Sequence, residues 1–253
     1  MKIFSERSAT FKPASSLLAA HGRWPNDLDV WHVDIPHGLT EWQSVELYLS
    51  ENERLRATRF RRKEDRFRFA VTRAALRALL SIRAGEPEGA LRISRGQYGK
   101  PILDGHPQIS FNVTHAGQHA LIAVSDSRQV GVDVEVIDPS IHWLELLDLV
   151  CTGVEQQMII SSSKASQLQM FFRCWTAKEA LLKATGVGLT EGLCGISLDL
   201  LSPGGQWLCD QSNDDKSTSL FQFHWLSEIP GYIGCVAFEK SASQVNNDEA
   251  SDS

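Results

Sequence analysis

Two carboxylates stand one residue apart in the segment GVDVE, residues 131–135. The wider run GVDVEVID has the alternation of a β-strand, in which every second side chain shares a face. Alternate valines are predicted to face a core, and Asp133 and Glu135 the opposite side. Neighbouring carboxylates repel each other unless a positive charge holds them, and Mg²⁺ prefers such hard oxygen ligands. An amphipathic edge strand with both acids in water is the alternative that spacing alone leaves open.

A third carboxylate comes from the segment WTAKEALLKATGVGL, residues 175–189. Its composition strongly favours a helix, which Gly186 is predicted to end. Trp175, Glu179 and Lys183 are four residues apart in turn and therefore share one helix face, with Lys178 at its border. A solvated Glu179–Lys183 pair, worth ~0.3–0.5 kcal/mol, is the plain alternative. The indole on the same face argues against a fully solvated surface.

The segment from residue 99 to 125 offers groups that could contact a phosphate. Its GKP turn presents Lys100 and free backbone N–H groups, followed by Pro101. The strand FNVTHAG is expected to end in a hydroxyl and an imidazole, Thr114 and His115. A single histidine at a turn can equally have only a structural role.

A basic segment, residues 54–68, contains eight basic and two acidic residues in a chain whose formal net charge is -6. Such a local cationic stripe on an acidic protein suggests a site for a specific anion. A solvated helix face and a nucleic-acid patch are the alternatives. Aromatic residues interleave there as in single-strand binders, whereas the overall acidity argues against that class.

Composition places the chain among ordinary globular proteins. It has 253 residues, of which 42% are hydrophobic and 22% charged. The five cysteines show no CxxC spacing and are expected to be reduced thiols. No apolar leader and no stretch near the ~20 apolar residues of a membrane span is present, so we expect a cytoplasmic protein without membrane contact.

The order strand, helices, long helix, strands is predicted twice along the chain. Asp34 and Asp133 both lie on a first strand, and Thr72 and Thr176 align within the long helices. We therefore expect an α+β fold of two similar halves, related by a pseudo-twofold axis, with the active site in the cleft between them. The expected organisation is an N-terminal extension at 1–27, halves at 28–126 and 127–240, and a disordered tail at 241–253.

The individual elements follow from periodicity and from glycine and proline breaks. Strands are expected at 29–35, 91–94, 108–113, 119–125, 130–137, 194–201, 206–210, 220–226 and 232–239, and helices at 40–49, 50–58, 64–84, 141–149, 152–160 and 166–185. A loop is expected at 211–219.

Taken together, the motifs resemble the 4′-phosphopantetheinyl transferase superfamily, in its larger pseudodimeric form. The family pattern is G-K-P, then F-N-x-S-H-S, then G-x-D-x-E and, about forty residues later, W-x-x-K-E-A-x-x-K. This sequence has GKP at 99–101, FNVTHAG at 111–117, GVDVE at 131–135 and WTAKEALLK at 175–183. Thr114 replaces the usual serine but keeps a hydroxyl, and Ala116 lacks the second serine.

The resemblance implies roles for these residues. Asp133, Glu135 and Glu179 would bind Mg²⁺, and Lys183, together with Lys178, would neutralise the pyrophosphate of coenzyme A. The expected nucleotide contacts are Arg54, Arg56, Arg68, Lys100, Pro101, Thr114 and His115. Glu179 and Lys183 would be the catalytic pair, with Glu179 as a base for the attacking hydroxyl.

The implied reaction transfers the 4′-phosphopantetheine arm of coenzyme A to a serine of an apo acyl or peptidyl carrier protein. Adenosine 3′,5′-bisphosphate is the expected leaving group. We expect a monomer without nucleic-acid partners, with the apolar region 141–160 either docking the carrier or packing in the core. The alternatives are a metal-dependent phosphohydrolase acting on nucleotides or coenzyme A, a nucleic-acid binding module using residues 54–68, and an inactive paralogue.

Overall fold

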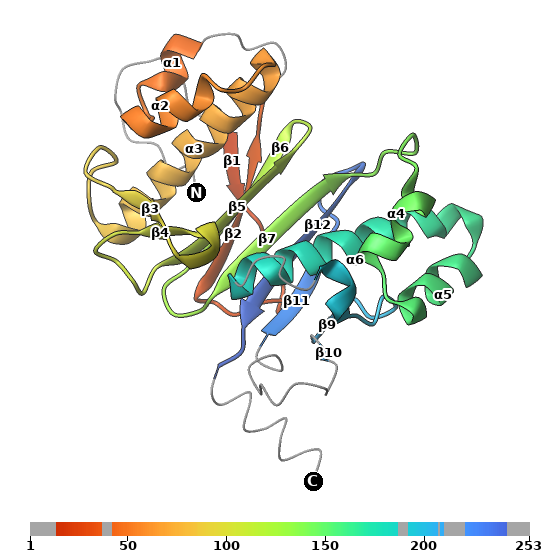
Figure 1. The fold of residues 1–253 in the computed structure, drawn as a ribbon. Coiled ribbons are helices and arrows are strands. Elements are labelled where there is room, and N and C mark those ends of the chain that lie inside the picture. The colour runs from red at the N-terminus through yellow and green to blue at the C-terminus, as the bar shows by residue number, and fades with distance from the viewer. Residues whose placement is uncertain (1–13, 37–41, 187–191, 207, 210–220, 242–253) are drawn as a thin grey trace.

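The computed structural model describes residues 14–36, 42–186, 192–206, 208–209 and 221–241. Within these residues, two four-stranded antiparallel sheets are each covered by a helix of 22 residues, and smaller two-stranded pairs flank them (Figure 1). The protein is therefore a mixed α+β structure, as the sequence predicts.

The first sheet has the strand order β1-β2-β6-β5. Its strands are β1 (Ala14–Leu17), β2 (Leu28–Asp34), β5 (Ser110–Ala116) and β6 (His119–Ser125). Helix α3 (Lys63–Ala84) packs on one face of this sheet, beside the short helices α1 (Trp42–Glu46) and α2 (Glu51–Ala57). The pair β3 (Ile93–Arg95) and β4 (Pro101–Leu103), joined through the 3₁₀ turn η1 (Gln97–Gly99), follows α3.

The second sheet has the order β7-β12-β11-β9. Its strands are β7 (Val130–Val136), β9 (Gly204–Gln206), β11 (Phe221–Leu226) and β12 (Tyr232–Glu239). Helix α6 (Lys164–Thr185) covers one face, and α4 (Trp143–Val150) and α5 (Gly153–Ser161) pack against α6. A second small pair, β8 (Ile196–Ser197) and β10 (Leu208–Cys209), follows the 3₁₀ turn η2 (Leu193–Gly195).

The period of two along the strands divides the core into three clusters. On β6, Ala120 and Ile122 face α3, whereas Leu121 and Ala123 face the second sheet. There they meet side chains of β7 and β12, including Val132. The third cluster thus joins the two halves, while the other two clusters anchor α3 and α6 to their own sheets.

Edge strands β5 and β7 of the two sheets meet through side chains rather than a main-chain ladder. Ser110 Oγ accepts a hydrogen bond from the backbone N–H of Val130 at 3.3 Å, and Asn112 Oδ1 accepts one from Val132 at 3.0 Å. These bonds satisfy N–H groups that an edge strand would otherwise leave open. The seam holds β7 in place directly beside β5.

Most predicted elements are confirmed to within a few residues, including both long helices, which are closed by left-handed glycines. Strand β1 was not predicted: it pairs with β2, so part of the expected N-terminal extension belongs to the first sheet. The strand expected at 194–201 is reduced to Ile196–Ser197. The loop expected at 211–219 and all but the first residue of the expected tail lie outside the described residues. None of the described helices is long and apolar enough to cross a membrane.

Candidate active site

Helix α6 lies against the face of β7 that carries the two carboxylates. A Cβ atom at Gly131 would come within 2.0 Å of the carbonyl oxygen of Ala180 and 2.4 Å of the backbone nitrogen of Ala184. Glycine at this position therefore allows close contact between strand and helix. Since side chains alternate along β7, the side chains of Asp133 and Glu135 lie on the same face of the strand as position 131, the face that packs against α6.

Asp133 is the centre of the site and is only 3% exposed. Its Oδ1 accepts hydrogen bonds from Lys183 Nζ at 2.5 Å and from Thr114 Oγ1 at 3.1 Å. Its Oδ2 is buried and has no hydrogen-bond partner among the residues that the structure describes. Because an unsatisfied buried carboxylate oxygen is costly, this atom marks a place where a positively charged ligand would stabilise the site.

The charge of Asp133 acts on two further carboxylates, Glu135 and Glu179. Burial raises the pKa of Glu135 to about 7, with the negative charges of Asp133 and Glu179 adding to the effect and Lys183 opposing it. Burial also raises the pKa of Glu179, which Lys183 lowers and Asp133 raises. The negative charge of Asp133 therefore reaches both glutamates and disfavours their charged forms.

The donor set suits a hard divalent cation. It consists of carboxylate oxygens, one of them an orphaned buried atom, and Mg²⁺ prefers oxygen ligands. The ligand atoms of the three carboxylates are not all within 4.8 Å of one another. Two other groups of side chains among the described residues do meet this distance. Asp133, Glu135 and Glu179 thus fit the expected ion by the chemistry of their donor atoms, but their side chains would have to move closer together to share it.

Cationic side chains of α3 and α6 gather around His115 near the end of β5. Desolvation by the surrounding protein lowers the pKa of His115, and the charges of Arg68, Lys183 and Arg73 lower it further. Arg68 donates from Nε to the carbonyl oxygen of Gly117 at 2.6 Å, which fixes it beside the turn after β5. The arrangement concentrates positive potential next to the carboxylates, as a polyphosphate ligand requires.

Arg73 was not predicted from the sequence. It lies on α3, and burial lowers its pKa, with the positive charges of Arg56, Arg95 and Arg77 contributing and Glu53 opposing them. Its position among the mostly apolar residues in the middle of α3 is the signal that could have indicated it. Arg56 lies over the ring of Phe69 with its guanidinium carbon 5.2 Å from the ring centroid, so it belongs to the same cationic group.

Arg54 lies further from this group. It is exposed on α2 and its guanidinium donates to the carbonyl oxygen of Glu46 at 3.3 Å. No interaction in the described part of the chain links Arg54 to the carboxylates or to His115. Its expected contact with the 3′-phosphate stays a prediction.

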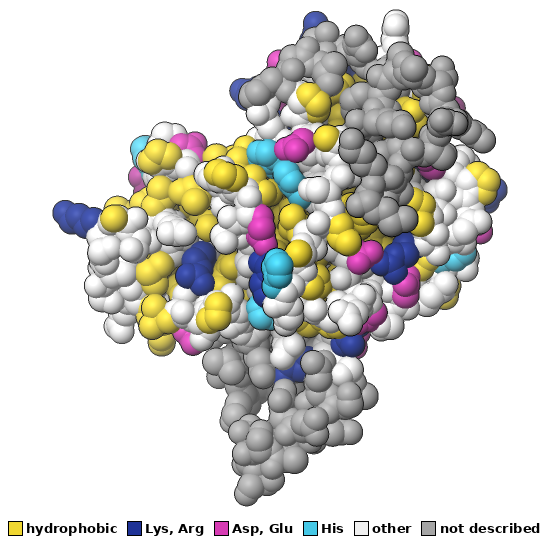
Figure 2. Space-filling model, turned by 180° about the vertical axis from the view of Figure 1, so that it is seen from behind, with side chains coloured by type: hydrophobic (Ala, Val, Ile, Leu, Met, Phe, Trp, Pro, Cys, Tyr) yellow, Lys and Arg dark blue, Asp and Glu magenta, His cyan; other side chains and the backbone are white. Residues whose placement is uncertain are grey.

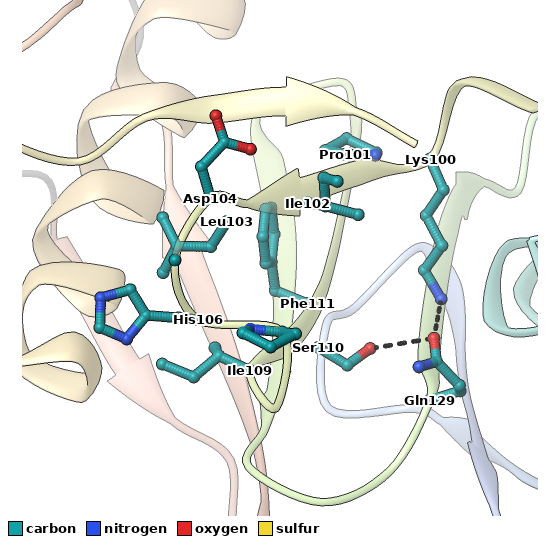
Figure 3. A pocket seen from close by; sticks show the side chains of 12 residues that line it. Lys100, Pro101, Ile102, Leu103, Asp104, His106, Ile109, Ser110, Phe111 and Gln129 are labelled. Atoms are coloured by element: carbon teal, nitrogen blue, oxygen red, sulfur yellow. Dashed lines mark hydrogen bonds between the residues drawn. The ribbon is translucent and has the colours of Figure 1, made fainter. Parts of the chain in front are cut away.

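A pocket of about 450 Å³ opens beside the GKP turn (Figure 3). Lys100, Pro101, Ile102, Phe111 and Gln129 are among its lining residues, so it carries an apolar wall next to polar groups. This is the kind of site that a planar heterocycle with a polar edge would occupy.

Lys100 connects the pocket to the second half. Its Nζ donates to Gln129 Oε1 at 3.0 Å and to the backbone carbonyl oxygens of Val130 at 3.2 Å and Ala184 at 2.8 Å. Burial lowers the pKa of Lys100 to about 8, with Glu239 opposing the effect. Lys100 therefore caps the end of α6, in addition to lining the pocket.

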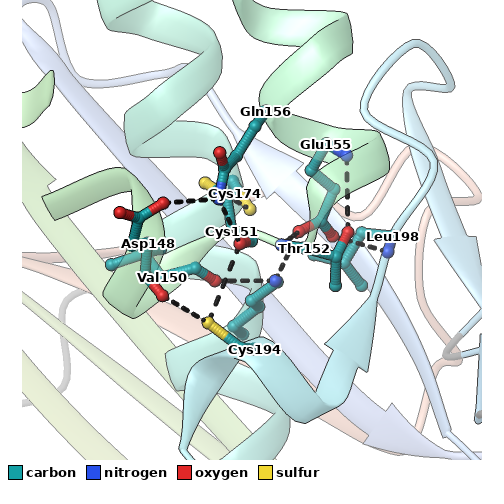
Figure 4. A network of polar contacts seen from close by, with 10 residues as sticks. Asp148, Val150, Cys151, Thr152, Glu155, Gln156, Cys174, Cys194 and Leu198 are labelled. Carbon is teal, nitrogen blue, oxygen red and sulfur yellow. Dashed lines mark hydrogen bonds and ion pairs between the residues drawn. The ribbon is translucent and has the colours of Figure 1, made fainter.

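Lys178 does not lie in the site, which corrects the expectation that it binds phosphate. Its side chain is fully buried, and Nζ donates to the carbonyl oxygen of Val150 at 2.7 Å and to Glu155 Oε2 at 2.5 Å. Glu155 also accepts from the backbone N–H groups of Thr152 and Leu198 (Figure 4). Lys178 thus ties α6 to α5 and to the segment after η2, a structural role.

Cys151 and Cys174 lie in the same network. Their sulfur atoms are 3.6 Å apart and both thiols are free and buried. Cysteine spacing in the sequence did not indicate this proximity, since tertiary packing between α6 and the end of α4 creates it.

The fold and the site define an α+β enzyme in which acidic side chains lie beside a cationic cluster and a pocket, as phosphate-ester chemistry requires. Residues 129–237 match the model of the 4′-phosphopantetheinyl transferase superfamily, and residues 37–127 match the 4′-phosphopantetheinyl transferase N-terminal model. The chain belongs to the 4′-phosphopantetheinyl transferase superfamily and is an enzyme of this type.

Relatives from several bacteria support this assignment. The slr0495 protein of Synechocystis sp., which carries a 4′-phosphopantetheinyl transferase name, is 37% identical over 185 residues, or 72% of each chain. The 4′-phosphopantetheinyl transferase HetI of Nostoc sp. is 32% identical over 66% of this chain and 71% of its own. The 4′-phosphopantetheinyl transferase Sfp of Bacillus subtilis is 28% identical over 68% and 76%, respectively.

Proposed function

We propose that the protein transfers the 4′-phosphopantetheine moiety of coenzyme A to a serine of an apo acyl or peptidyl carrier protein, leaving adenosine 3′,5′-bisphosphate. The observation that carries the proposal is the carboxylate of Asp133. One of its oxygens is bound by Lys183 and Thr114, and the other is buried beside two more acids with no hydrogen-bond partner from the described residues. Membership of the family supports the reaction type.

Asp133, Glu135 and Glu179 would hold Mg²⁺. When bound, the ion would draw charge from the pyrophosphate and orient it. Lys183 is 30% exposed on its side chain and reaches Asp133 with its ammonium group, so it can turn toward a phosphate that enters the site. Its charge would stabilise the negative charge that develops on the leaving phosphate.

The cationic group on α3 would bind the nucleotide part of coenzyme A. The positive charges of Arg68 and Arg73 both act on His115. This group would face a ligand that carries several negative charges. The pocket at Lys100 and Pro101 would take the adenine ring, because its walls combine apolar side chains with polar groups. Thr114 would act by holding Asp133 in place through its hydroxyl.

Glu179 would accept the proton from the attacking serine hydroxyl. Its raised pKa brings the carboxylate closer to the range in which a general base works at neutral pH. A glutamate that binds the ion tightly is a poorer base, so the carboxylate would take the proton directly or through a water molecule.

The two halves would form the site together. Thr114 and Arg68 come from the first half, whereas Asp133 and Lys183 come from the second. The 22-residue helices α3 and α6 each cover one sheet, which supports a pseudo-twofold relation between residues 28–126 and 127–240. We propose that the enzyme acts as a monomer, since each chain supplies both sides of the site.

The deciding experiment combines purified protein, coenzyme A, Mg²⁺ and a panel of apo carrier proteins, with intact mass as the readout. The proposal predicts a carrier heavier by one phosphopantetheine group, and neither Asp133→Ala nor Glu179→Ala should give this product. Normal turnover in both variants would contradict the proposed roles. Release of nucleotide from coenzyme A without any carrier would instead indicate a phosphohydrolase, and salt-dependent binding of a labelled oligonucleotide would indicate a nucleic-acid binding module.

A further inference from the structure

Two histidines and an aspartate meet on the first sheet, outside the candidate active site. His32 and Asp34 lie two residues apart on β2, and His119, which opens β6, is the cross-strand partner of Asp34. Nε2 of His32 lies 2.8 Å from Nδ1 of His119. Oδ1 of Asp34 lies 3.1 Å from that Nδ1 and 3.6 Å from Nε2 of His32. Three atoms that can act as metal ligands therefore converge from adjacent strands.

Protons alone satisfy this arrangement poorly. A neutral imidazole has one N–H donor and one lone pair, and an ionised carboxylate only accepts. If His32 donates to Nδ1 of His119, the single lone pair of that Nδ1 accepts this proton, and the oxygen of Asp34 lies 3.1 Å from the same nitrogen without a proton between them. If Nδ1 of His119 carries the proton, this single proton must serve both His32 and Asp34. A cation placed between the three atoms would satisfy all of them at once.

We propose that His32, Asp34 and His119 form a binding site for a divalent transition-metal ion of the zinc class. Tetrahedral zinc with ligands ~2.1 Å away separates neighbouring ligand atoms by about 3.4 Å, and the three observed separations lie around this value. Imidazole nitrogens select zinc, cobalt or nickel over Mg²⁺, which prefers oxygen. The site therefore differs in chemistry from the all-carboxylate site of Asp133.

Access and support also fit an ion site. The side chains of His32 and His119 are 14% and 22% exposed, so both rings are held by packing, whereas Asp34 is 58% exposed and leaves an approach from solvent. The ring of Tyr232 contacts His119 edge-on, with centroids 4.7 Å apart. The face of the molecule seen in Figure 2 shows histidine side chains beside acidic ones at the surface.

The site adjoins the turn that carries active-site groups. Tyr232, which fixes the ring of His119, accepts a hydrogen bond from the backbone N–H of Gln118 at 3.4 Å. The neighbouring Gly117 accepts from Arg68. An ion bound at His119 would therefore stabilise the turn between β5 and β6, and with it the junction between the two halves. We expect a higher unfolding temperature with zinc than with a chelator.

The test is a titration of metal-free, full-length protein with Co²⁺ in a large excess of Mg²⁺, which would occupy the carboxylate site. Four-coordinate cobalt absorbs visible light much more strongly than the hexaaqua ion, so the spectrum reports the geometry. We expect one equivalent of strongly absorbing Co²⁺, displaced by one equivalent of Zn²⁺. His119→Gln should abolish this signal, and Asp34→Asn should weaken binding roughly tenfold or more.

His142→Gln is the matched control, because His142 is exposed and lies outside the cluster. It should bind Co²⁺ like the unchanged protein. Circular dichroism checks that each variant is folded; if His119→Gln is not, the exposed Asp34→Asn variant decides. Absence of the strong absorption in the unchanged protein, equal binding by Asp34→Asn, or displacement of Co²⁺ by Mg²⁺ would each overturn the proposal.

Discussion

Lys183 and Asp133 form an ion pair of 2.5 Å between α6 and β7, and this pair engages only one oxygen of the carboxylate. The other oxygen is buried and, in the described part of the chain, has no hydrogen-bond partner. The pair thus orients Asp133 and leaves half of its ligand capacity free. A residue whose task was only to join strand and helix would be expected to satisfy both oxygens.

Asp133→Asn tests whether the ion pair with Lys183 orients a carboxylate whose negative charge is needed for transfer. The amide keeps the size of the side chain and can still accept from Thr114, but it removes the negative charge. We expect a loss of transfer of roughly 100-fold or more, in the range seen when one preorganised electrostatic group is removed from an active site. Steady-state kinetics with varied Mg²⁺ is the measurement. The exposed Glu51→Gln variant at the start of α2 serves as the control and should retain full activity.

Substitutions of two lysines five residues apart on α6 should have opposite effects on stability and on transfer activity. Lys178→Met leaves Glu155 buried without its cationic partner, which typically costs ~3–5 kcal/mol in the free energy of unfolding. Lys183→Gln keeps a donor for Asp133 and should change that free energy by about 1 kcal/mol or less, while transfer is lost. Urea unfolding and turnover are measured on both variants. A stable but inactive Lys178→Met protein would contradict the structural role of Lys178.

The sequence predicted the parts of this site that have a local signal. Alternation along β7 and the spacing of Glu179 and Lys183 on α6 follow from period alone, and both long helices end where glycine allows a left-handed residue. Strand β1 was missed, because its four residues are mostly exposed and show no clear alternation.

Long-range contacts could not be read from spacing. Lys178 lies next to Glu179 in the sequence but points into the contact with α5, because neighbouring residues of a helix face different directions. The cluster of His32 and His119 joins residues that are 87 positions apart and become neighbours only when β2 pairs with β6.

Stability of the metal-free enzyme should depend on pH through Glu135. Its pKa in the folded protein is about 7, above the usual 4.5, so the folded state binds the proton more tightly than the unfolded state. The stabilisation that comes from the tighter proton binding of folded Glu135 is therefore complete below about pH 4.5. It is lost as the pH rises through about 7. The raised pKa of Glu179 acts in the same direction.

Chemical unfolding between these pH values measures the effect. We expect the free energy of unfolding to fall with rising pH, the slope to shrink in Glu135→Gln, and added Mg²⁺ to reverse the fall by favouring the ionised carboxylates. Glu145→Gln should keep the slope of the unchanged protein. If the metal-free protein instead became more stable with rising pH, and Glu135→Gln removed that gain, the predicted direction of the pH dependence would be wrong.

The contact between Gly131 and α6 predicts a large difference between two glycine substitutions. Gly131→Ala places a methyl group against backbone atoms of Ala180 and Ala184 that cannot move without shifting the helix. Overpacking of this kind costs ~1–3 kcal/mol, and it should also displace Asp133 relative to Lys183 and reduce turnover. Gly153→Ala is the control, since a Cβ there meets no atom of the described residues within 4 Å. Urea unfolding of both variants should show a loss only for Gly131→Ala.

Thr114 offers a test of how the first half positions a residue of the second. Its hydroxyl donates to Asp133 Oδ1 at 3.1 Å across the seam between β5 and β7. Thr114→Ser keeps the donor and should be close to the unchanged enzyme, whereas Thr114→Val keeps the shape and removes the donor. We expect Thr114→Val to lower kcat about tenfold with a smaller change in the KM for coenzyme A, because a hydrogen bond to a charged group contributes ~1.5–3 kcal/mol. A change confined to KM would instead indicate that the hydroxyl contacts the nucleotide phosphates. Normal activity of Thr114→Ser would distinguish either role of the hydroxyl from a packing defect.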